Sequence, residues 1–407
     1  MDTDFTPENA AQVADVVAWA ISEEKPLEVV GRGTRRQIGR AAQYGATLDL
    51  SGLTGITLYE PEELVLSARA GTPLSEIQNL LAEHNQELAF EPPNLSGLLG
   101  GADDAGTIGG AIACNFSGPR RIKAGAARDH FLGFNAISGR GELFKSGGRV
   151  VKNVTGYDMC KMLAGSWGTL AVMSDLTVKV LPAAETETTL ILTGADMTQA
   201  VQAMSAAMQS ACEVSGACHL PAPLNGASSV EAMSAAGQGA TALRLEGIAP
   251  SVAYRAERLT EILKGYGTVD RLEEPQSRTM WREVRDVGFF NDKTERLVWK
   301  LSVPPGDGAA VLGRLEHEAG ARGYLDWAGG LIWLDVPAKL DGGAELVRAA
   351  VESSGGHATL IRAAEAIRAS VEVFHPQSEG VGGLSDRLKQ GFDPSGVLNP
   401  GRMRPNR

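Results

Sequence analysis

The sequence contains little cysteine. Only four of its 407 residues are cysteines, and they are widely and irregularly spaced. The paired Cys-x-x-Cys motifs that ligate zinc or an iron–sulfur cluster are therefore absent. Such low usage favours reduced, structural thiols in a cytoplasmic protein over a disulfide framework. The four residues are Cys114, Cys160, Cys212 and Cys218.

Long apolar runs and a surplus of basic charge are also missing. No stretch approaches the roughly 18 apolar residues that span a bilayer, so membrane contact is expected only through a partner. The first ten residues, MDTDFTPENA, have neither a basic start nor an apolar stretch and are not expected to be a secretory signal. With 38 basic and 49 acidic side chains the formal net charge is −11. Nucleic acid is therefore not an expected partner, because proteins that track phosphate backbones are normally basic.

The common nucleotide-binding fingerprints are missing as well. No Gly-x-Gly-x-x-Gly stretch follows a predicted strand, and no Walker loop occurs. A Rossmann-type dinucleotide site is therefore disfavoured. Any diphosphate must be held by loops of another kind.

Apolar periodicity predicts three parts. Residues 1–182 alternate strands and helices, with a first helix beginning at Thr6-Pro7 and a short apolar strand at 27–30. Residues 183–375 suit an α+β domain with helices packed on one face of an antiparallel sheet. Residues 376–407 form a C-terminal segment with a short amphipathic helix.

Two glycine-rich loops accompany clusters of arginine in this acidic chain. The first is Gly31–Arg36, and the second, Gly106–Gly110, is followed by Gly118-Pro119-Arg120-Arg121. Glycines let the backbone approach a ligand closely, and successive N–H groups form an anion-binding concavity. Arginines nearby can pair with phosphate. Either loop alone would more often be a tight turn with solvated arginines, but two in one domain predict a diphosphate site.

Five segments, taken in order, resemble a known family. They are GRGTRR from Gly31, GTIGG from Gly106, RDHFLGFNAISGRGE from Arg128, VKNVTGYDMCKMLAGSWGTL from Val151 and DPSGVLNPGRM from Asp393. Together they are similar to the FAD-binding domain of the vanillyl-alcohol oxidase and p-cresol methylhydroxylase type. The GPRR turn, the VKNVTGYD stretch and the pair His375-Pro376 most resemble the FAD-binding subunits of bacterial glycolate oxidase. The resemblance implies an α+β fold: an FAD domain of two α/β subdomains plus an α+β cap with an antiparallel sheet.

The resemblance also implies which residues hold FAD. No histidine adjoins the first loop, where some relatives attach the flavin, and His130 lies among apolar neighbours, so non-covalent FAD is expected. Trp167 stands where the family often has Glu. The implied cofactor-binding residues are Gly31, Arg32, Gly33, Thr34, Arg35, Arg36, Pro92, Pro93, Thr107, Ile108, Gly109, Gly110, Asn115, Gly118, Pro119, Arg120, Arg128, Asp129, Gly165, Ser166, Gly168, Thr169 and Val172.

Candidates for catalysis are fewer. Metal-dependent relatives carry closely spaced histidines and a carboxylate in the second domain, whereas His219, His317, His357 and the border residue His375 lie far apart here, so no metal site is predicted. His375 is the candidate base. Arg282, Arg285 and Lys300 are candidates for holding a substrate carboxylate, with a solvated surface charge as the alternative for each.

The function implied by the resemblance is that of an FAD-binding subunit of a glycolate oxidase (dehydrogenase) complex, which oxidises glycolate to glyoxylate. Two partners are implied: a sister FAD subunit bearing the metal-binding histidines, and an iron–sulfur subunit that passes electrons to quinone. The expected location is cytoplasmic, at the inner membrane only through partner subunits. Two alternatives stay open: a self-sufficient FAD-dependent 2-hydroxyacid dehydrogenase, and a non-catalytic structural or electron-relay flavin subunit.

Overall fold

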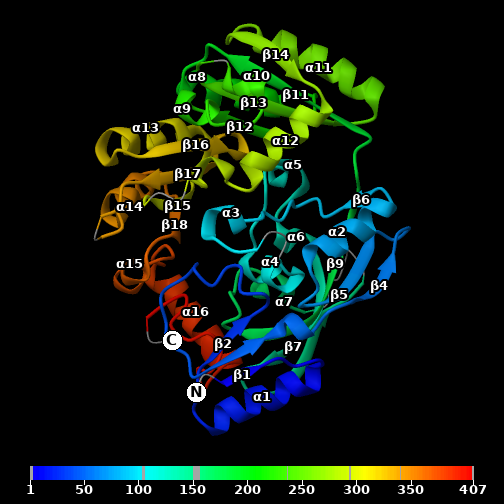
Figure 1. The fold of residues 1–407 in the computed structure, drawn as a ribbon, viewed down its shortest axis with the longest axis vertical. Coiled ribbons are helices and arrows are strands. Elements are labelled where there is room, and N and C mark those ends of the chain that lie inside the picture. The colour runs from blue at the N-terminus through cyan, green and yellow to red at the C-terminus, as the bar shows by residue number, and fades with distance from the viewer. Residues whose placement is uncertain are drawn as a thin grey trace. The chain divides into compact units, whose positions relative to one another are not determined.

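The computed structural model describes residues 3–102, 106–149, 156–235, 237–292, 295–339 and 341–405. The chain divides into two compact units, whose elements are labelled in Figure 1. Unit 1 comprises Met1–Phe116, Gly125–Ala183 and Glu372–Arg407, and unit 2 comprises Ser117–Ala124 and Ala184–Val371. Residues 151–155 of the VKNVTGYD stretch lie outside the described residues.

Unit 1 contains a small parallel sheet, a five-stranded antiparallel sheet and a two-stranded ribbon. The parallel sheet has the order β1 (Thr3–Phe5), β3 (Ala46–Asp49), β2 (Leu27–Val30), and the antiparallel sheet has the order β4 (Ile56–Glu60), β5 (Val65–Arg69), β9 (Ala171–Lys179), β7 (Phe131–Ser138), β8 (Leu143–Gly147). The ribbon pairs β10 (Leu181–Pro182) with β6 (Gln86–Glu87). The helices are α1 (Ala10–Ser22), α2 (Leu74–Glu83), α3 (Ser96–Leu99), α4 (Ile108–Cys114), α6 (Ala127–His130), α7 (Met159–Leu163) and α16 (Glu379–Phe392).

Helix α1 begins later than the predicted start at Thr6-Pro7. Its N-cap is Asn9, whose side-chain oxygen accepts a hydrogen bond from the Gln12 N–H at 3.0 Å. The preceding residues are used differently, because Thr3–Phe5 pairs with β3 as a parallel strand. The chain then needs the next few residues to turn away from the sheet. The buried face of the helix carries Val13, Val17 and Ala20.

The C-terminal tail completes the parallel sheet of unit 1. Leu398 forms an isolated parallel bridge with Leu27, next to β2. The fully buried carboxylate of Asp393 fixes the turn before it, accepting hydrogen bonds from the Val397 and Leu398 amides at 3.0 and 2.9 Å. Lys389 on α16 donates to the same carboxylate at 2.6 Å. A charged residue is tolerated at this depth because it is both paired and hydrogen-bonded.

Unit 2 is built on one eight-stranded antiparallel sheet with helices packed against it. The strand order is β14 (Thr268–Leu272), β11 (Thr186–Thr193), β13 (Ala240–Gly247), β12 (Gly216–Leu220), β16 (Arg322–Asp326), β17 (Leu331–Val336), β15 (Leu297–Ser302), β18 (His357–Arg362). The helices are α5 (Arg121–Ala124), α8 (Met197–Gln209), α9 (Ala222–Asn225), α10 (Glu231–Ser234), α11 (Ala249–Leu263), α12 (Glu274–Arg285), α13 (Gly308–Ala319), α14 (Ala344–Glu352) and α15 (Glu365–Ser370). The architecture is α+β, as the sequence predicts.

The boundaries of the units differ from the predicted 1–182, 183–375 and 376–407 mainly at one place. Ser117–Ala124 lies within the predicted first domain but belongs to unit 2. Arg120 explains why: its guanidinium makes two hydrogen bonds to the Glu246 carboxylate on β13, at 3.1 and 2.7 Å. The Trp327 ring N–H also donates to the Gly118 carbonyl at 3.0 Å. Long-range pairs of this kind have no signature in local sequence.

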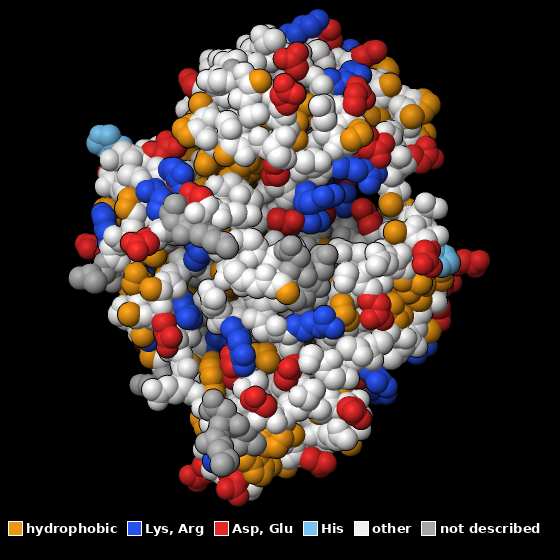
Figure 2. Space-filling model, in the orientation of Figure 1, with side chains coloured by type: hydrophobic (Ala, Val, Ile, Leu, Met, Phe, Trp, Pro, Cys, Tyr) orange, Lys and Arg blue, Asp and Glu red, His pale blue; other side chains and the backbone are white. Residues whose placement is uncertain are grey.

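The visible surface in Figure 2 shows acidic and basic side chains interspersed, with the hydrophobic ones in small groups among them. In the part of the chain that the structure describes, no helix is both long and apolar enough to cross a membrane.

Because the Arg120–Glu246 pair is buried, we expect unit 2 to lose unfolding free energy in acid. Burial opposes ionisation of Glu246, but Arg244 and Arg120 outweigh it and lower its pKa from 4.5 to about 2. A depressed folded-state pKa contributes stability above about pH 4.5, and this is lost as pH falls towards 2. E246Q should therefore lose about 3 kcal/mol of unfolding free energy at pH 7. Between pH 4.5 and 2 its unfolding free energy should also change less with pH than that of the parent. Both quantities are measured by urea unfolding.

The control for this variant is E213Q. Glu213 also pairs with a residue of the Ser117–Ala124 segment, Lys123 at 3.3 Å, where both side chains are about half exposed. Its second partner, Arg255, is buried but lies at 3.9 Å, near the limit for an ion pair. Exposed pairs contribute little, so E213Q should unfold like the parent. An E246Q variant whose stability falls with pH as steeply as the parent's would contradict the role given to this carboxylate.

Candidate functional site

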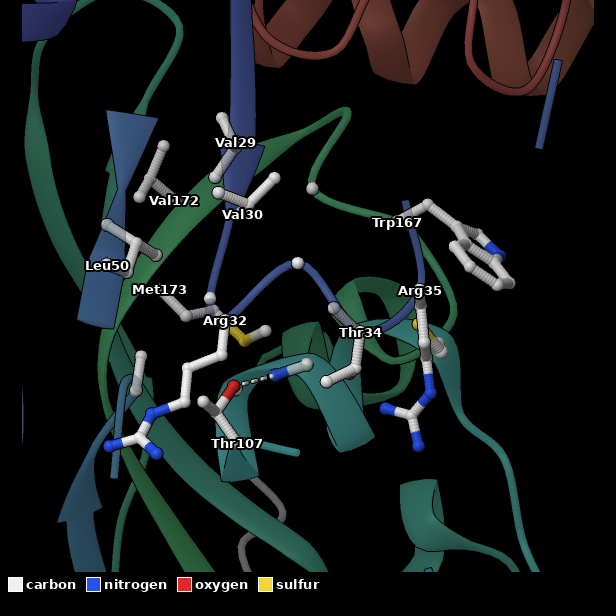
Figure 3. A pocket seen from close by; sticks show the side chains of 18 of the residues that line it. Val29, Val30, Arg32, Thr34, Arg35, Leu50, Thr107, Trp167, Val172 and Met173 are labelled. Carbon is white, nitrogen blue, oxygen red and sulfur yellow. Dashed lines mark hydrogen bonds between the residues drawn. The ribbon is translucent and has the colours of Figure 1, made fainter. Parts of the chain in front are cut away.

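The pocket of interest lies in unit 1 and brings both glycine-rich loops together with the C-terminal tail. It contains about 720 Å³ of space, its open side included. Figure 3 shows Arg32, Thr34 and Arg35 on one wall and Thr107 on another. The lining residues are Val29, Val30, Gly31, Arg32, Gly33, Thr34, Arg35, Arg36, Leu50, Ala70, Thr107, Gly109, Gly110, Ala113, Cys114, Trp167, Gly168, Ala171, Val172, Met173 and Arg402.

The two loops meet at Gly31 and Thr107. A Cβ atom added at Gly31 would lie 2.5 Å from the Thr107 side-chain oxygen, a distance that real Cβ atoms do not show. Gly109 is equally constrained, because its added Cβ would lie 2.7 Å from the Ala70 carbonyl. Glycine is therefore required on both sides of the pocket for packing.

The two loops differ in what their backbone offers a ligand. In the second loop the amides are already used: Ile108 and Gly109 donate to the Thr72 and Ala70 carbonyls at 3.0 and 2.9 Å, and Gly110 donates to the Thr107 hydroxyl at 3.2 Å. In the first loop, the amides of residues 32–34 donate to no other described residue. Gly33 and Thr34 are half-buried, and half-buried N–H groups need an acceptor. The first loop is therefore the side of the pocket whose backbone can donate to an anion.

The electrostatics of the pocket also favour an anion. Arg35 and Arg402 are both buried, at 8% and 6% exposure, and within the described residues neither forms an ion pair with a carboxylate. The Arg402 Nε is buried and makes no hydrogen bond there. By contrast, the more exposed Arg36 is neutralised by Glu28 at 2.7 Å. Two buried guanidinium groups without a counter-charge are costly unless a negatively charged ligand compensates them.

The opposite side of the pocket is apolar. Val30, Leu50, Val172 and Met173 converge there from strands β2 and β9 and from the segment after β3 (Figure 3). An elongated ligand with an anionic part and a flat apolar part fits this division, since such sites combine apolar walls with a few polar groups. A dinucleotide has both parts.

The structure gathers about half of the predicted cofactor residues at this pocket. The predicted residues that line it are Gly31, Arg32, Gly33, Thr34, Arg35, Arg36, Thr107, Gly109, Gly110, Gly168 and Val172. Pro93 stands behind it, where its carbonyl accepts a hydrogen bond from Arg35 at 3.2 Å. Ile108 points instead into the apolar core of unit 1. Pro92 does not line this pocket.

The remaining predicted residues serve the local framework. Asn115 caps α4 in the left-handed conformation and accepts a hydrogen bond from the Arg128 amide at 2.9 Å. Asp129 caps α6 and pairs with Lys161 at 2.8 Å. Gly118, Pro119 and Arg120 belong to unit 2. Gly165, Ser166 and Thr169 line a separate cavity beside α16.

Several lining residues were not predicted from the sequence. Trp167 and Arg402 are the clearest, since both lie inside segments that carry the family resemblance but were not assigned to the site. Val29 and Val30 end the strand before the first loop, and Leu50 follows β3. Met173 follows the predicted Val172, and Cys114 precedes the predicted Asn115. The one signal in the sequence that could have indicated these lining residues is their position next to a glycine loop or a predicted residue.

The candidate catalytic residues are distributed over both units. His375 lines a cavity in unit 1 together with Gln377, Asp386 and Arg404. The other three lie in unit 2. Among the described residues, no group of three or more His, Cys, Asp or Glu side chains could hold a metal ion.

Of the three candidates in unit 2, Lys300 has the most unusual surroundings. Arg285 pairs with its neighbour Asp286 at 2.7 Å, and Arg282 is exposed. The Lys300 ammonium lies 5.0 Å from the ring centroid of Trp327. Burial and the nearby charge of Arg121 lower the pKa of Lys300 to about 8, although Asp326 opposes this shift.

Comparison with known proteins identifies the class. Residues 2–147 match the family model described as an FAD binding domain. In the solved structures, p-cresol methylhydroxylase superimposes with a TM-score of 0.74 over 99% of this chain and 88% of its own, at 14% identity. The fold is thus the p-cresol methylhydroxylase type, and the chain is an FAD-binding flavoprotein.

Two curated relatives narrow the assignment. The glycolate oxidase subunit GlcE of Escherichia coli is 32% identical over 95% of this chain and 95% of its own length. The glycolate oxidase subunit GlcD of Bacillus subtilis is 27% identical over 50% of this chain and 42% of its own length. The chain belongs to the family of the glycolate oxidase subunit GlcE.

FAD fits the residues of the pocket. The free amides of residues 32–34 suit the diphosphate, and the apolar side at Leu50 and Val172 suits a flat ring. The buried guanidinium groups of Arg35 and Arg402 need negative charge, which the cofactor carries.

The contact at Gly31 predicts that even a methyl group there impairs FAD binding. G31A should raise the dissociation constant of FAD about 10- to 100-fold, because overpacking of this size costs about 1–3 kcal/mol. The measurement is a fluorescence titration of apoprotein with FAD. G148A is the control, since a methyl group there meets nothing within 4 Å. Equal affinity in G31A and G148A would show that the two loops do not converge as described.

We expect the reactivity of the Cys114 thiol to report directly whether FAD occupies the pocket. It is the partly exposed cysteine of the four and lines the pocket, whereas Cys160, Cys212 and Cys218 are buried. Burial raises the pKa of its thiol, with Arg35 and Arg402 opposing the rise, so labelling should be slow and faster at alkaline pH. N-ethylmaleimide should label Cys114 in apoprotein, and FAD should suppress this, as read by peptide mass spectrometry. Unchanged labelling with saturating FAD would place the cofactor elsewhere.

Proposed function

We propose that this chain is the FAD-bearing GlcE-type subunit of a glycolate oxidase complex, which oxidises glycolate to glyoxylate and passes the electrons through an iron–sulfur subunit to quinone. The observation that carries the proposal is the likeness to GlcE across 95% of both chains, which includes unit 2 as well as the FAD-binding unit. A likeness confined to the cofactor domain would support only a flavoprotein.

When bound, FAD would supply the capacity to accept a hydride and to release single electrons. The protein would position the cofactor and provide its electrostatic surroundings. Residues 32–34 would hold the diphosphate through their amides, and Arg35 and Arg402 would compensate the negative charge of the cofactor. Trp167 closes one end of the pocket, packed edge-on against Phe116 with 5.7 Å between ring centroids. None of these residues is a base for the substrate hydroxyl.

The proposal assigns the substrate chemistry to a sister FAD subunit. Removing the hydroxyl proton of glycolate needs a base or a metal, and unit 2 offers little of either in its described residues. Burial lowers the pKa of His219 to about 4, and its ring accepts or donates a 2.9 Å hydrogen bond with Thr241, so it is a neutral core residue. The similarity to GlcD, a second glycolate oxidase subunit, supports a related FAD subunit as the partner that carries the metal histidines.

The proposal places the iron–sulfur cluster in a partner subunit. Three of the four cysteines are buried singly, and burial raises the pKa of Cys160 to about 12, which disfavours the thiolate that a cluster requires. Electrons from the flavin therefore leave through another subunit in this proposal. The proposal places the chain in the cytoplasm, where the same partner would bring it to the inner membrane.

A second candidate is a self-sufficient FAD-dependent 2-hydroxyacid dehydrogenase. The specific observation in its favour is the cavity in unit 1 that contains His375, a possible proton acceptor, together with the cation Arg404. A third candidate is a non-catalytic structural or electron-relay flavin subunit, whose addition would not raise glycolate-dependent dye reduction through any substrate chemistry of its own.

Reconstitution of the complex distinguishes the candidate functions. The isolated chain with FAD should be yellow, should keep its flavin oxidised under anaerobic glycolate or D-lactate, and should release the flavin on acid precipitation. Adding the sister FAD subunit and the iron–sulfur subunit should restore glycolate-dependent dye reduction above the level of those two subunits alone. Anaerobic bleaching of the isolated chain at full rate would overturn the complex and favour the self-sufficient enzyme.

A further inference from the structure

The C-terminal helix α16, red in Figure 1, carries an apolar stripe that the chain itself does not cover. Gly380, Val381, Leu384, Leu388 and Gly391 fall within about 100° of the helix circumference, since each residue advances about 100°. A stripe of this width normally packs against a core. Here no residue of α16 is buried, and Val381 and Leu384 are 52% and 51% exposed.

The two glycines of the stripe are not explained by packing within the chain. A Cβ atom added at Gly380 or at Gly391 would meet no described atom within 4 Å. Glycine inside a helix is destabilising relative to alanine, because it loses more backbone freedom on folding. Glycine is also the residue that lets another backbone approach closely. Two glycines on the same face as Leu384 therefore suit a partner that lies close against the helix.

The charged groups of α16 lie away from the stripe and are paired within the chain. Lys389 donates to the Asp393 carboxylate at 2.6 Å and to the Thr169 carbonyl at 2.8 Å. Asp386 pairs with Arg404 at 2.9 Å. A partner that covers the stripe is therefore expected to present uncharged side chains, because an unpaired charge in an apolar contact is costly.

The stripe continues into a groove between α16 and the loop of residues 165–169. The groove contains about 850 Å³ of space, its open side included, and its apolar lining residues are Met162, Leu170, Leu388 and Met403. Leu388 belongs to both the stripe and the groove, so we call the two together the α16 surface. Methionine side chains are common at protein-binding surfaces because they adapt to the shape of a partner. A groove of this kind suits an amphipathic helix.

The α16 surface lies one loop away from the FAD pocket. Within the loop of residues 165–169, Trp167 and Gly168 line the FAD pocket, whereas Ser166 and Thr169 line the groove. The Thr169 hydroxyl is 3.8 Å from the sulfur of Met403, on the groove side. Electron transfer weakens steeply with distance, so a subunit that takes electrons from this flavin must dock close to its pocket. The α16 surface meets that requirement.

We propose that the α16 surface docks the electron-accepting iron–sulfur subunit, an assignment that rests on the proposed function. The partner lays an uncharged, apolar helix face along the stripe and into the groove. Two single-electron transfers, each to an oxidised cluster, return reduced FAD to its oxidised form, and the protons of the flavin are released to water. Electron-transfer partners commonly have small interfaces, which a single helix face and its groove can provide.

The test compares two variants of the α16 surface, L384E and G380A, in the full chain with FAD bound. L143E is the control for the first, because Leu143 is 65% exposed on β8 of the same unit. G313A is the control for the second, because Gly313 lies inside α13 and a Cβ there meets nothing within 4 Å. The measurements are the dissociation constants for the iron–sulfur subunit and for the sister FAD subunit, and the rate at which the iron–sulfur subunit reoxidises the photoreduced flavin.

L384E should bind the iron–sulfur subunit at least about tenfold more weakly than the parent, because a charge then enters an apolar contact. G380A should also bind it about tenfold more weakly, because the added methyl group separates the two backbones. Alanine favours a helix, so G380A should resist urea at least as well as the parent. Flavin reoxidation at limiting partner should slow in both variants, while the affinities for FAD and for the sister subunit stay within about twofold. Both controls should match the parent.

Three outcomes would overturn the proposal. Parental affinity for the iron–sulfur subunit in both variants would show that it docks elsewhere. Weaker binding of the sister subunit alone would assign the surface to that partner. A parental dimer that L384E dissociates, with the iron–sulfur affinity unchanged, would make the surface a contact between two copies. If L384E fails to fold, G380A decides.

The parent chain tests the proposed function separately. If it binds neither subunit, the assignment to a glycolate oxidase complex fails, and the docking proposal fails with it. If it binds the sister subunit but not the iron–sulfur subunit, only the docking proposal is overturned.

Discussion

The close approach of Gly31 to Thr107 is the constraint on which the cofactor site depends. Gly31 follows a strand of the parallel sheet, and Thr107 begins a helix packed on the antiparallel sheet, so the contact joins two parts of unit 1. A side chain at position 31 would separate them. The loop amides, the buried arginines and the apolar wall can act on one ligand only because this contact brings them together.

The two glycine loops divide their tasks in a way that their similar composition conceals. The second loop satisfies its own amides and serves as a rigid wall, while the first leaves its amides for a ligand. The charge is divided as well. Exposed Arg36 is neutralised by Glu28, and the uncompensated charge is concentrated in buried Arg35 and Arg402. Buried charge of this kind is strong because little water screens it.

How much could be predicted from the sequence depends on the range of the interaction. Gly31–Arg36 and Thr107 were predicted to belong to one site, and the structure brings them together in one pocket, because glycine loops act through local backbone. Gly118–Arg120 resemble the same motif, yet Arg120 joins unit 2 through Glu246, a partner more than a hundred residues away. Arg402 was missed for a similar reason, since nothing in the tail indicates which of its arginines turns inward. The late start of α1 also has a long-range cause, the pairing of β1 with β3.

The tail has a consequence for the order in which the pocket can form. Asn399 joins strand β2 to the loop before β9, accepting from the Val29 amide and donating to the Trp167 carbonyl, both at 2.8 Å. Arg402 lies beside it and is the pocket residue furthest along the chain from the glycine loops. A folding intermediate in which the tail has not yet docked on β2 would therefore leave one side of the pocket open, and we expect such an intermediate to bind FAD weakly.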